Sequence, residues 1–320
     1  MLTLPTITIV IPTYRRPDVL RQCLQKITQQ DSLDQCDVRI YDNGAPHDSQ
    51  SVASEYQNQL NLTYTLNEPG HGFGYSVSRG SREATGDIIV ELNDDALVPH
   101  DLIPRIRSLF QQDERIGIVG VRAEEEGYHQ EGEGIGRIDA SHGLIANFNR
   151  PTQAAIDVDH IYGFCYAYRR ELLSRGAVHD NVLLAKDYSS GNRIETDHCL
   201  TARKLGYRVL YDGSLVVTHL AKPRGDLDEW SARWKINQIR NTLYLYLKHF
   251  GWLGQRRLAL RYMLIHDVGI LSLLRRPNYA NLVYFFTGLR ARLSAVAHWC
   301  IFRLTRRALK PLETNKEPDH

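Results

Sequence analysis

The sequence predicts an α/β fold with a mostly parallel sheet, followed by a helical C-terminal region. Two observations lead to this prediction. In the first two thirds of the chain, short β-branched and aliphatic runs alternate with polar segments of helical periodicity, which is typical of parallel strands joined by helices. From about residue 228 the strands stop, and apolar residues recur only at helical spacing.

The first half of the α/β region has the clearest elements. Residues 7–11 are a β-branched run that Pro12 stops, as expected of a strand buried on both faces. Asp18 is the predicted N-cap of the next helix, which ends before Asp31. The further predicted elements are strands at 38–41, 62–66 and 87–92, with helices at about 49–59 and 76–85 between them.

The second half of the region has weaker patterns. The predicted elements are, in order, strand 116–122, loop or hairpin 123–155, strand 161–168, helix 197–205 and strands 207–211 and 215–219. Gly206 is expected to end the helix. His219 then stands at the end of the last predicted strand.

The C-terminal third is predicted to be helical, with Pro277 marking a break before the last helix. One face of that helix is apolar and contains Leu282, Phe286, Leu289, Leu293, Val296, Cys300 and Leu304. No apolar run reaches the ~18 residues needed to span a bilayer, so this region can lie on a membrane but not cross it. We place domain boundaries after residues 225 and 312, with 313–320 as a tail.

The composition fits a globular protein of 320 residues, with 42% hydrophobic residues and a formal charge of +2. It excludes collagen-like chains, disordered tails and mini-protein scaffolds. The five cysteines are widely spaced without a C-x-x-C pair, so we expect neither a disulfide framework nor a zinc cage. The N-terminal residues lack a basic segment and carry Pro5 and Pro12, which favours a strand over a secretory signal. We therefore expect a cytoplasmic protein.

The charge is unevenly distributed. Residues 256–310 contain eleven Lys or Arg residues and one acid, a local charge of +10. Such a basic end suggests contact with an anionic surface, either membrane or nucleic acid, whereas the alternative is that the arginines only solvate helix faces. We favour peripheral contact with the inner face of the plasma membrane, or homo-oligomer formation through these helices, with no nucleic-acid partner.

Carboxylates and one histidine stand where predicted strands end or helices begin. Asp94 and Asp95 follow the fourth strand, Glu195 and Asp197 open a helix, and His219 ends a late strand. Oxygen ligands with one imidazole suit Mg²⁺ or Mn²⁺, whose other positions are often filled by substrate phosphates. Taken singly, each acid is also explained as a turn or cap residue and the histidine as a structural one. Together they predict a metal-assisted site for a phosphorylated substrate.

Six segments in this order resemble the family-two glycosyltransferases with a GT-A fold, over roughly residues 5–222. They are ITIVIPTYRR, YDNG, N-x-x-G-x-G through A-x-G-D, LNDDA, E-T-D-H-C-L-x-A-R-x-L-G-Y-R-V and V-V-x-H. The resemblance, closest to the rhamnosyltransferase-like group, implies a Rossmann-like, mixed and mostly parallel sheet flanked by helices. It also implies an inverting transferase that uses a UDP- or dTDP-sugar and a divalent metal, Mg²⁺ or Mn²⁺.

The resemblance assigns donor-binding roles to several loops. Pro12, Thr13 and Arg15 match the loop that lies along the nucleoside, and Asp42 matches the acid that meets the pyrimidine edge. A carboxylate there can accept a hydrogen bond from the ring N3–H.

A second donor loop and the metal position follow in the same way. Asn67, Gly70 and Gly72 match the loop that closes over ribose and diphosphate, where glycines let the backbone approach phosphate. Asn93, Asp94 and Asp95 occupy the family's D-x-D position, with Asn in place of the first acid. We therefore expect Asp95 and His219 to bind the metal, and Asp94 to contact the sugar or the metal's surroundings.

The register of E-T-D-H places Glu195 where the family has its catalytic base, usually an Asp, with Asp197 as the competitor. The segment 162–164 matches one that lies under the donor sugar, although an aromatic there can equally be core. Residues of the irregular middle segment are acceptor-site candidates: Tyr128, His129, His142 and Asn147. The acceptor itself stays open among a saccharide, a lipid-linked glycan, a protein and a natural product.

Three other functions would each require a different sequence feature. A sugar-nucleotide nucleotidyltransferase would carry a glycine-rich basic loop after its first strand, and PTYRRPD has no glycine. A dinucleotide-binding oxidoreductase would have G-x-G-x-x-G directly after that strand. A non-catalytic membrane-surface or nucleic-acid binding protein would use the basic end alone.

Overall fold

A computed structural model of the chain describes residues 4–44, 48–127, 133–139, 143–184, 192–220, 232–264 and 270–308. The chain divides into two compact units, Met1–Trp234 and Lys235–His320. The predicted boundaries after residues 225 and 312 lie outside the described residues.

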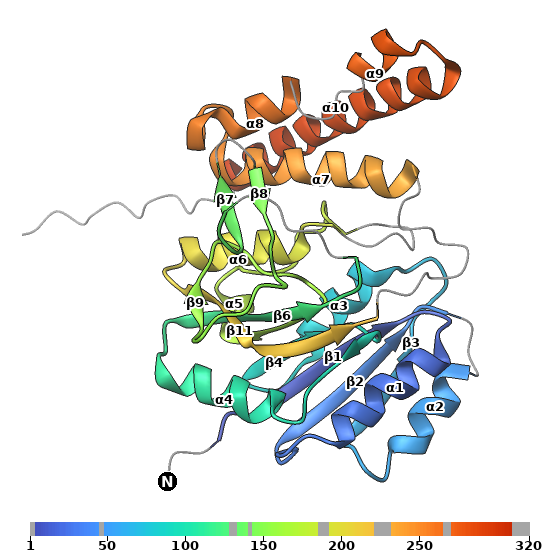
Figure 1. Ribbon diagram of the computed structural model, residues 1–320, viewed down its shortest axis with the longest axis vertical. Helices are drawn as coiled ribbons and strands as arrows, with labels where there is room; N and C mark the ends of the chain where they lie inside the picture. Colours follow the sequence, from blue (N-terminus) through green and yellow to red (C-terminus); the bar gives the residue numbers. More distant parts are fainter. Residues whose placement is uncertain are drawn as a thin grey trace, which may run out of the picture. The chain divides into compact units, whose positions relative to one another are not determined.

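The first unit is built on a nine-stranded sheet with the order β3-β2-β1-β4-β10-β6-β11-β5, in which β9 also pairs with β11 (Figure 1). The strands are β1 (Ile7–Thr13), β2 (Cys36–Asp42), β3 (Leu62–Leu66), β4 (Ile88–Leu92), β5 (Ala96–Leu97), β6 (Ile116–Glu124), β9 (Ile156–Asp157), β10 (Cys165–Arg169) and β11 (Arg208–His219). The strands β1 to β4 pair in parallel, as do β6 and β11, whereas β10 is antiparallel to both of its neighbours. The prediction of a mixed, mostly parallel sheet is therefore confirmed.

Helices cover both faces of this sheet (Figure 1). They are α1 (Pro17–Thr28), α2 (Asp48–Tyr56), α3 (Phe73–Glu83), α4 (Leu102–Gln112), α5 (Glu171–Ser174) and α6 (Ile194–Lys204). Residues of α1, α2 and α4 pack with Ile9 and Ile11 on one face, whereas α6 packs with Val10 on the other. This alternation follows from the period of two along a strand, and it explains why all seven residues of β1 are buried, as predicted.

Several boundaries differ from the sequence-based predictions. The N-cap of α1 is Arg16, not Asp18, because Pro17 takes the first helical position that proline favours. The helix α3 begins three residues earlier than predicted, and α6 begins at Ile194, so that Glu195 and Asp197 lie in its first turn. The two last predicted strands form one strand, β11, with an irregularity between Asp212 and Val216.

Two further elements lie where the sequence patterns were weak. The helix α4 was missed, although its buried residues Leu102, Ile103, Ile106, Leu109 and Phe110 have helical spacing. The segment predicted as loop or hairpin contains the antiparallel pair β7 (Arg137–Asp139) and β8 (Gly143–Ile145).

The second unit is helical, as predicted. Its helices are α7 (Ala232–Phe250), α8 (Gly254–Leu264), α9 (Ile270–Arg275) and α10 (Tyr279–Ala308), and the break between the last two lies at Pro277. The helices α7 and α10 pack together through Tyr244 and Phe302, whose ring centroids are 6.4 Å apart. Across the residues that the structure describes, no helix combines the length and the hydropathy needed to span a bilayer.

Candidate active site

The parallel strands β1, β2 and β3 end together at one edge of the sheet, because Thr13 pairs with Asp42 and Asp42 with Leu66. The strand β11 ends at the same sheet with His219 opposite Ala96, directly after Asp94 and Asp95. The carboxyl ends of parallel strands are where α/β folds bind ligands. The candidate site residues from distant parts of the sequence therefore reach one edge.

Arg16, at the N-cap of α1, bridges the two aspartates that follow β4. Its guanidinium donates to Asp94 and, from Nη1, to Asp95 Oδ2 at 2.8 Å. Thr13 Oγ1 donates to Asp94 Oδ2 at 2.8 Å. Burial lowers the pKa of Arg16, but the charges of Asp94 and Asp95 outweigh it and raise that pKa overall. The two acids thus share the buried guanidinium of Arg16.

His219 lies beside these aspartates at the end of β11. We call the group formed by Arg16, Asp94, Asp95, Glu125 and His219 the corner. The Nε2 of His219 lies 3.4 Å from Asp95 Oδ1, and its Nδ1 lies 2.8 Å from Glu125 Oε2. Glu125 Oε2 also accepts a hydrogen bond from Tyr162 Oη at 3.1 Å. Burial lowers the pKa of His219, but hydrogen bonds and charge from Asp95 and Glu125 raise it to about 9. Each nitrogen of the imidazole therefore faces a carboxylate oxygen. Such surroundings favour a positive charge at the ring, either a proton or another cation.

Asp95 and His219 are of the residue types that bind divalent cations, and they lie close together. Two neighbouring ligand atoms about 2.1 Å from an octahedral ion lie roughly 3.0 Å apart, and the Asp95 Oδ1 to His219 Nε2 separation is 3.4 Å. Three or more clustered acids, histidines or cysteines with metal-binding geometry do not occur among the described residues. A site with two protein ligands leaves the remaining positions to substrate phosphates and water.

Two residues of this corner, Arg16 and Glu125, were not predicted from the sequence. Arg15, which it selected instead, is exposed and has a left-handed backbone (φ 51°). Its Cγ lies near Gly44, since a Cβ built there would be 3.2 Å away. Glu125 carries no motif, but it directly follows β6, and the strand-end rule used for Asp94 would have selected it.

Asp42 lies beside this corner and is fully buried. Its Oδ1 accepts the Gly44 backbone N–H at 2.7 Å, and its Oδ2 accepts Tyr64 Oη at 2.8 Å. Pro12 and Thr13 are buried on the neighbouring strand β1. Most of the predicted nucleoside group, Pro12, Thr13 and Asp42, is therefore part of a rigid strand end.

The loop before α3 is tied to the same edge by amide hydrogen bonds. Asn67 Nδ2 donates to Asn43 Oδ1 at 3.0 Å and to Ser76 Oγ at 2.9 Å, and Asn67 Oδ1 accepts from Arg79. Gly70 has φ 92°, which favours glycine. Gly72 is the N-cap of α3 and accepts from the backbone N–H groups of the helix's first turn.

Glu195 is connected to the corner through residues 162–164. Its carboxylate lies against Gly163, because a Cβ built on Gly163 would be 3.1 Å from Glu195 Oε2. The adjacent Tyr162 contacts Glu125, and the Asn93 backbone N–H donates to the Phe164 carbonyl at 2.8 Å. Burial raises the pKa of Glu195, as needed for a carboxylate that accepts protons near neutral pH.

Asp197, the competitor, faces the interior. It is 1% exposed and lies near two buried histidines. Burial lowers the pKa of His198 to about 4, whereas the charge of Glu91 outweighs burial and raises the pKa of His179; the charge of Asp197 is a minor contribution to both. These histidines belong to a cluster around Glu91, whose Oε1 lies 2.9 Å from His179 Nε2. The structure thus brings Glu195 to the edge and Asp197 towards the core.

The remaining acceptor candidates divide in two. Tyr128, His129 and His142 lie outside the described residues. Asn147 is buried with φ 54°, and its Nδ2 donates to the Gly134 carbonyl at 2.8 Å. That contact holds the loop around β7 and β8 in place.

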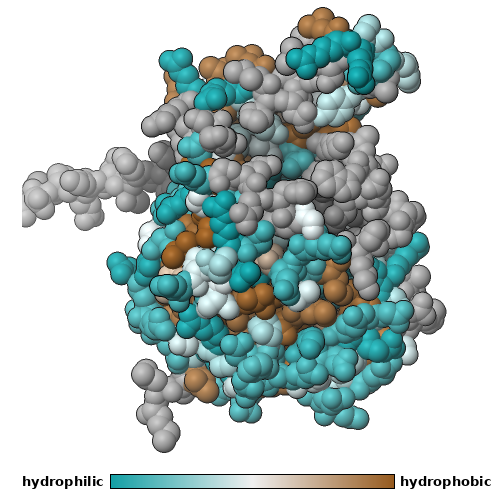
Figure 2. Space-filling view, viewed as in Figure 1, coloured by the Kyte–Doolittle hydropathy of each residue, from teal (hydrophilic) through white to brown (hydrophobic). Residues whose placement is uncertain are grey.

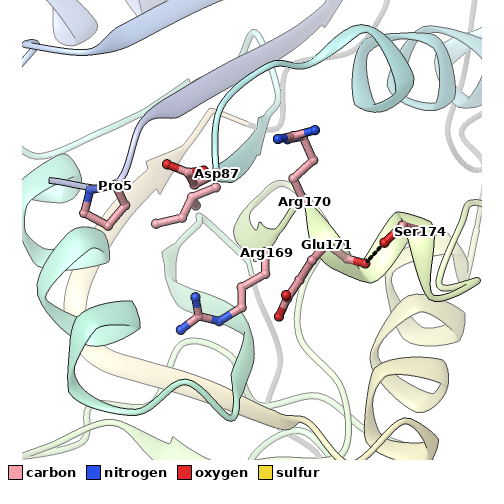
Figure 3. A pocket seen from close by; sticks show the side chains of 7 residues that line it. Pro5, Asp87, Arg169, Arg170, Glu171 and Ser174 are labelled. Atoms are coloured by element: carbon pink, nitrogen blue, oxygen red, sulfur yellow. Dashed lines mark hydrogen bonds between the residues drawn. The ribbon is translucent and has the colours of Figure 1, made fainter. Parts of the chain in front are cut away.

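A cavity of about 500 Å³ lies at the opposite edge of the sheet, where β1 and β4 begin (Figure 3). Its lining includes Asp87, Arg169 and Arg170. Each already has partners: Asp87 accepts from Thr6, Arg169 donates to the Ile116 carbonyl and Arg170 to the Gly86 carbonyl. This cavity is therefore separate from the candidate active site.

The sequence is similar to a protein family and to a curated relative. Residues 8–176 match the model of glycosyl transferase family 2. The uncharacterized glycosyltransferase YfnE of Bacillus subtilis (strain 168) is 25% identical over 113 residues, which cover 35% of this chain and only 29% of that relative.

Two solved structures share the fold. Residues 1–349 of S. aureus TarS, in complex with UDP-GlcNAc, give a TM-score of 0.64 at 13% identity, covering 91% of this chain and 81% of that one. The mannosyltransferase PcManGT from Pyrobaculum calidifontis, in complex with GDP-Man and Mn²⁺, gives 0.57 at 19% identity, covering 96% and 81%. The family model spans more than half of this chain, and both structures are GT-A glycosyltransferases. The chain therefore belongs to glycosyl transferase family 2 and has the GT-A fold.

Proposed function

We propose that this protein transfers a sugar from a nucleotide-diphosphate donor, a UDP- or dTDP-sugar, to an acceptor hydroxyl with inversion at the anomeric carbon. The observation that carries the proposal is the continuous set of contacts at one sheet edge. Asp95 meets His219, His219 meets Glu125, Glu125 meets Tyr162, and Gly163 meets Glu195.

The donor binds across the ends of β1, β2 and β4. The buried Asp42 carboxylate faces the nucleoside, and the hydrogen bonds from Gly44 and Tyr64 fix its orientation. The loop of Gly70 and Gly72 and the N-terminus of α3 lie beside the diphosphate, where backbone N–H groups and the helix dipole favour an anion.

Asp95 and His219 hold the divalent cation in this proposal, and Asp94 orients its surroundings through Arg16 and Thr13. A bound Mg²⁺ or Mn²⁺ supplies positive charge for the diphosphate leaving group. Glu125 accepts from His219 Nδ1, which fixes the ring so that Nε2 faces Asp95. The PcManGT structure holds a nucleotide sugar, GDP-Man, together with Mn²⁺ on a similar fold, which supports a nucleotide-sugar donor with a divalent metal.

Glu195 acts as the general base. Its carboxylate takes the proton of the acceptor hydroxyl as that oxygen attacks the anomeric carbon from the face opposite the diphosphate. A positioned base contributes typically about 10²- to 10⁴-fold to the rate. Asp197 has its carboxylate among buried histidines, so we assign it to positioning the first turn of α6.

The proposal is tested with a panel of nucleotide sugars and NAD, each added with and without Mn²⁺, by thermal unfolding of the full chain. We expect stabilisation by one UDP- or dTDP-sugar together with Mn²⁺ and not by either alone, because each completes the binding site of the other. The same donor should then give an inverted product with a suitable acceptor. Stabilisation by NAD, or by no nucleotide sugar, would contradict the proposal.

A further inference from the structure

The last helix, α10, presents two different faces. One face is buried against its own unit: Ala291 and Ala295 are buried, Phe302 contacts the ring of Tyr244, and Trp299 contacts Trp252. These contacts hold α10 as a packed helix, so its outer face is a fixed surface.

The outer face of α10 is apolar, which is unusual for an exposed helix. Its residues recur every three or four positions: Leu282, Phe286, Leu289, Leu293, Ala297, Cys300 and Leu304. All seven are exposed, with Phe286 at 56%, Leu293 at 57% and Leu304 at 66%. At a rise of 1.5 Å per residue this stripe is about 33 Å long. Single exposed leucines are ordinary, but a continuous apolar stripe marks an interaction surface.

The sequence pattern predicted most of this apolar face, but not whether it is buried or exposed. The structure turns it outward, and Figure 2 shows hydrophobic atoms at the surface among the C-terminal helices. Figure 1 places α10 at the end of the colour range, in red.

Positive charge surrounds the stripe. The exposed Arg290 and Arg303 lie on opposite borders of it, one at each side of the helix. Arg275 and Arg276 are exposed just before the helix begins. Between residues 256 and 310 the only acid is Asp267. The apolar stripe is therefore bordered by a charge that attracts anions.

We infer that the outer face of α10 docks on an anionic lipid surface, lying in the plane of the interface. Apolar side chains enter the acyl boundary while the bordering arginines meet lipid phosphates, which is how interfacial helices bind. A second copy of the chain fits less well, because two surfaces of this charge repel each other. Nucleic acid would leave the apolar stripe in contact with water. This inference stands apart from the proposed function.

The experiment measures sedimentation of the full chain with vesicles of phosphatidylcholine alone and of equal parts phosphatidylcholine and phosphatidylglycerol. We expect binding to the anionic vesicles only, weakened by salt. The double variant Phe286→Glu/Leu293→Glu should bind at least about tenfold more weakly, because it removes apolar burial. Arg290→Ala/Arg303→Ala should lose about 25-fold, at about fivefold per arginine near an anionic surface.

Leu205→Glu is the matched control, because Leu205 is an exposed leucine of the first unit and its substitution should leave vesicle binding unchanged. Thermal unfolding of each variant checks that it folds, which we expect since the four side chains on α10 are exposed. No sedimentation with anionic vesicles would overturn the inference, as would equal sedimentation of wild type and both double variants. A concentration-dependent dimer that Phe286→Glu/Leu293→Glu abolishes, without lipid binding, would replace it with self-association.

Discussion

Two clusters of carboxylates and histidines lie in the first unit, one at the sheet edge and one in the core. The edge cluster contains Asp95, His219 and Glu125, and the core cluster contains Glu91, His179 and His198. Glu91 accepts hydrogen bonds from Tyr166 Oη at 2.7 Å and Tyr168 Oη at 2.9 Å, within strands β4 and β10. The residue types are the same, but the surroundings are not.

A carboxylate–histidine pair therefore does not by itself define a reactive site. In the core cluster, two tyrosine hydroxyls and the imidazole of His179 already contact the Glu91 carboxylate, so no ligand is needed. In the edge cluster, Asp94 and Asp95 share the guanidinium of Arg16, and a cation can supply positive charge in its place. Position at the sheet edge and a replaceable counter-charge separate the two clusters.

The largest effect is expected at Glu195, the edge carboxylate assigned as base. Glu195→Gln keeps the shape of the side chain but removes its proton affinity, so transfer should fall about 10²- to 10⁴-fold. Donor binding, measured by thermal shift with Mn²⁺, should be unchanged. Asp197→Asn is the comparison, and a larger loss of transfer in that variant, with normal stability, would exchange the roles of the two acids.

Removing a charged residue from either cluster should lower the free energy of unfolding, but a metal ion should restore it only for the edge cluster. Arg16→Gln removes the guanidinium that the two buried aspartates share, which lowers the free energy of unfolding by about 3 kcal/mol. Added Mn²⁺ should restore most of that loss, because the ion replaces the missing charge. Thermal unfolding with and without Mn²⁺ measures this, and destabilisation that Mn²⁺ leaves untouched would count against a cation site at Asp95.

Glu91→Gln is the matched change in the core cluster. It leaves the buried His179 without its charged partner, so the free energy of unfolding should also fall by about 3 kcal/mol. Here Mn²⁺ should give no more stabilisation than it gives the wild type, since no ligand position opens. Equal rescue of Glu91→Gln and Arg16→Gln by Mn²⁺ would remove the distinction between the clusters.

The smallest effect is expected for a change of one pH unit, through the core cluster. Burial, with the charge of His179, lowers the pKa of His198 to about 4. The unfolded chain therefore binds a proton that the folded one does not between about pH 6.5 and 4. In that window stability should fall with falling pH by about 1.4 kcal/mol per pH unit.

His160 has its pKa lowered to about 4 as well, chiefly by burial, so His198→Gln should remove only its own share of the slope. Denaturant unfolding at a series of pH values measures both slopes. An unchanged slope in His198→Gln would show that this histidine is not buried in its neutral form.

The strand ends were predictable from the sequence, because a buried run such as residues 7–11 and the polar residue after it are local features. The contacts that complete the site were not, because they join distant segments: Arg16 is 79 positions from Asp95, and His219 is 94 positions from Glu125. No sequence motif indicated the core cluster. Glu91 lies inside a buried strand, where a charged residue is not expected. The direction of the apolar face of α10 also depends on packing, which periodicity cannot supply.

We propose that Asp95 and His219 together bind a divalent cation that holds the donor diphosphate. The most direct measurement is the affinity of the protein for Mn²⁺ with and without UDP, in the wild type, Asp95→Asn and His219→Ala. We expect UDP to tighten Mn²⁺ binding in the wild type and both variants to lose this coupling. Coupling of wild-type strength in either variant would contradict the claim.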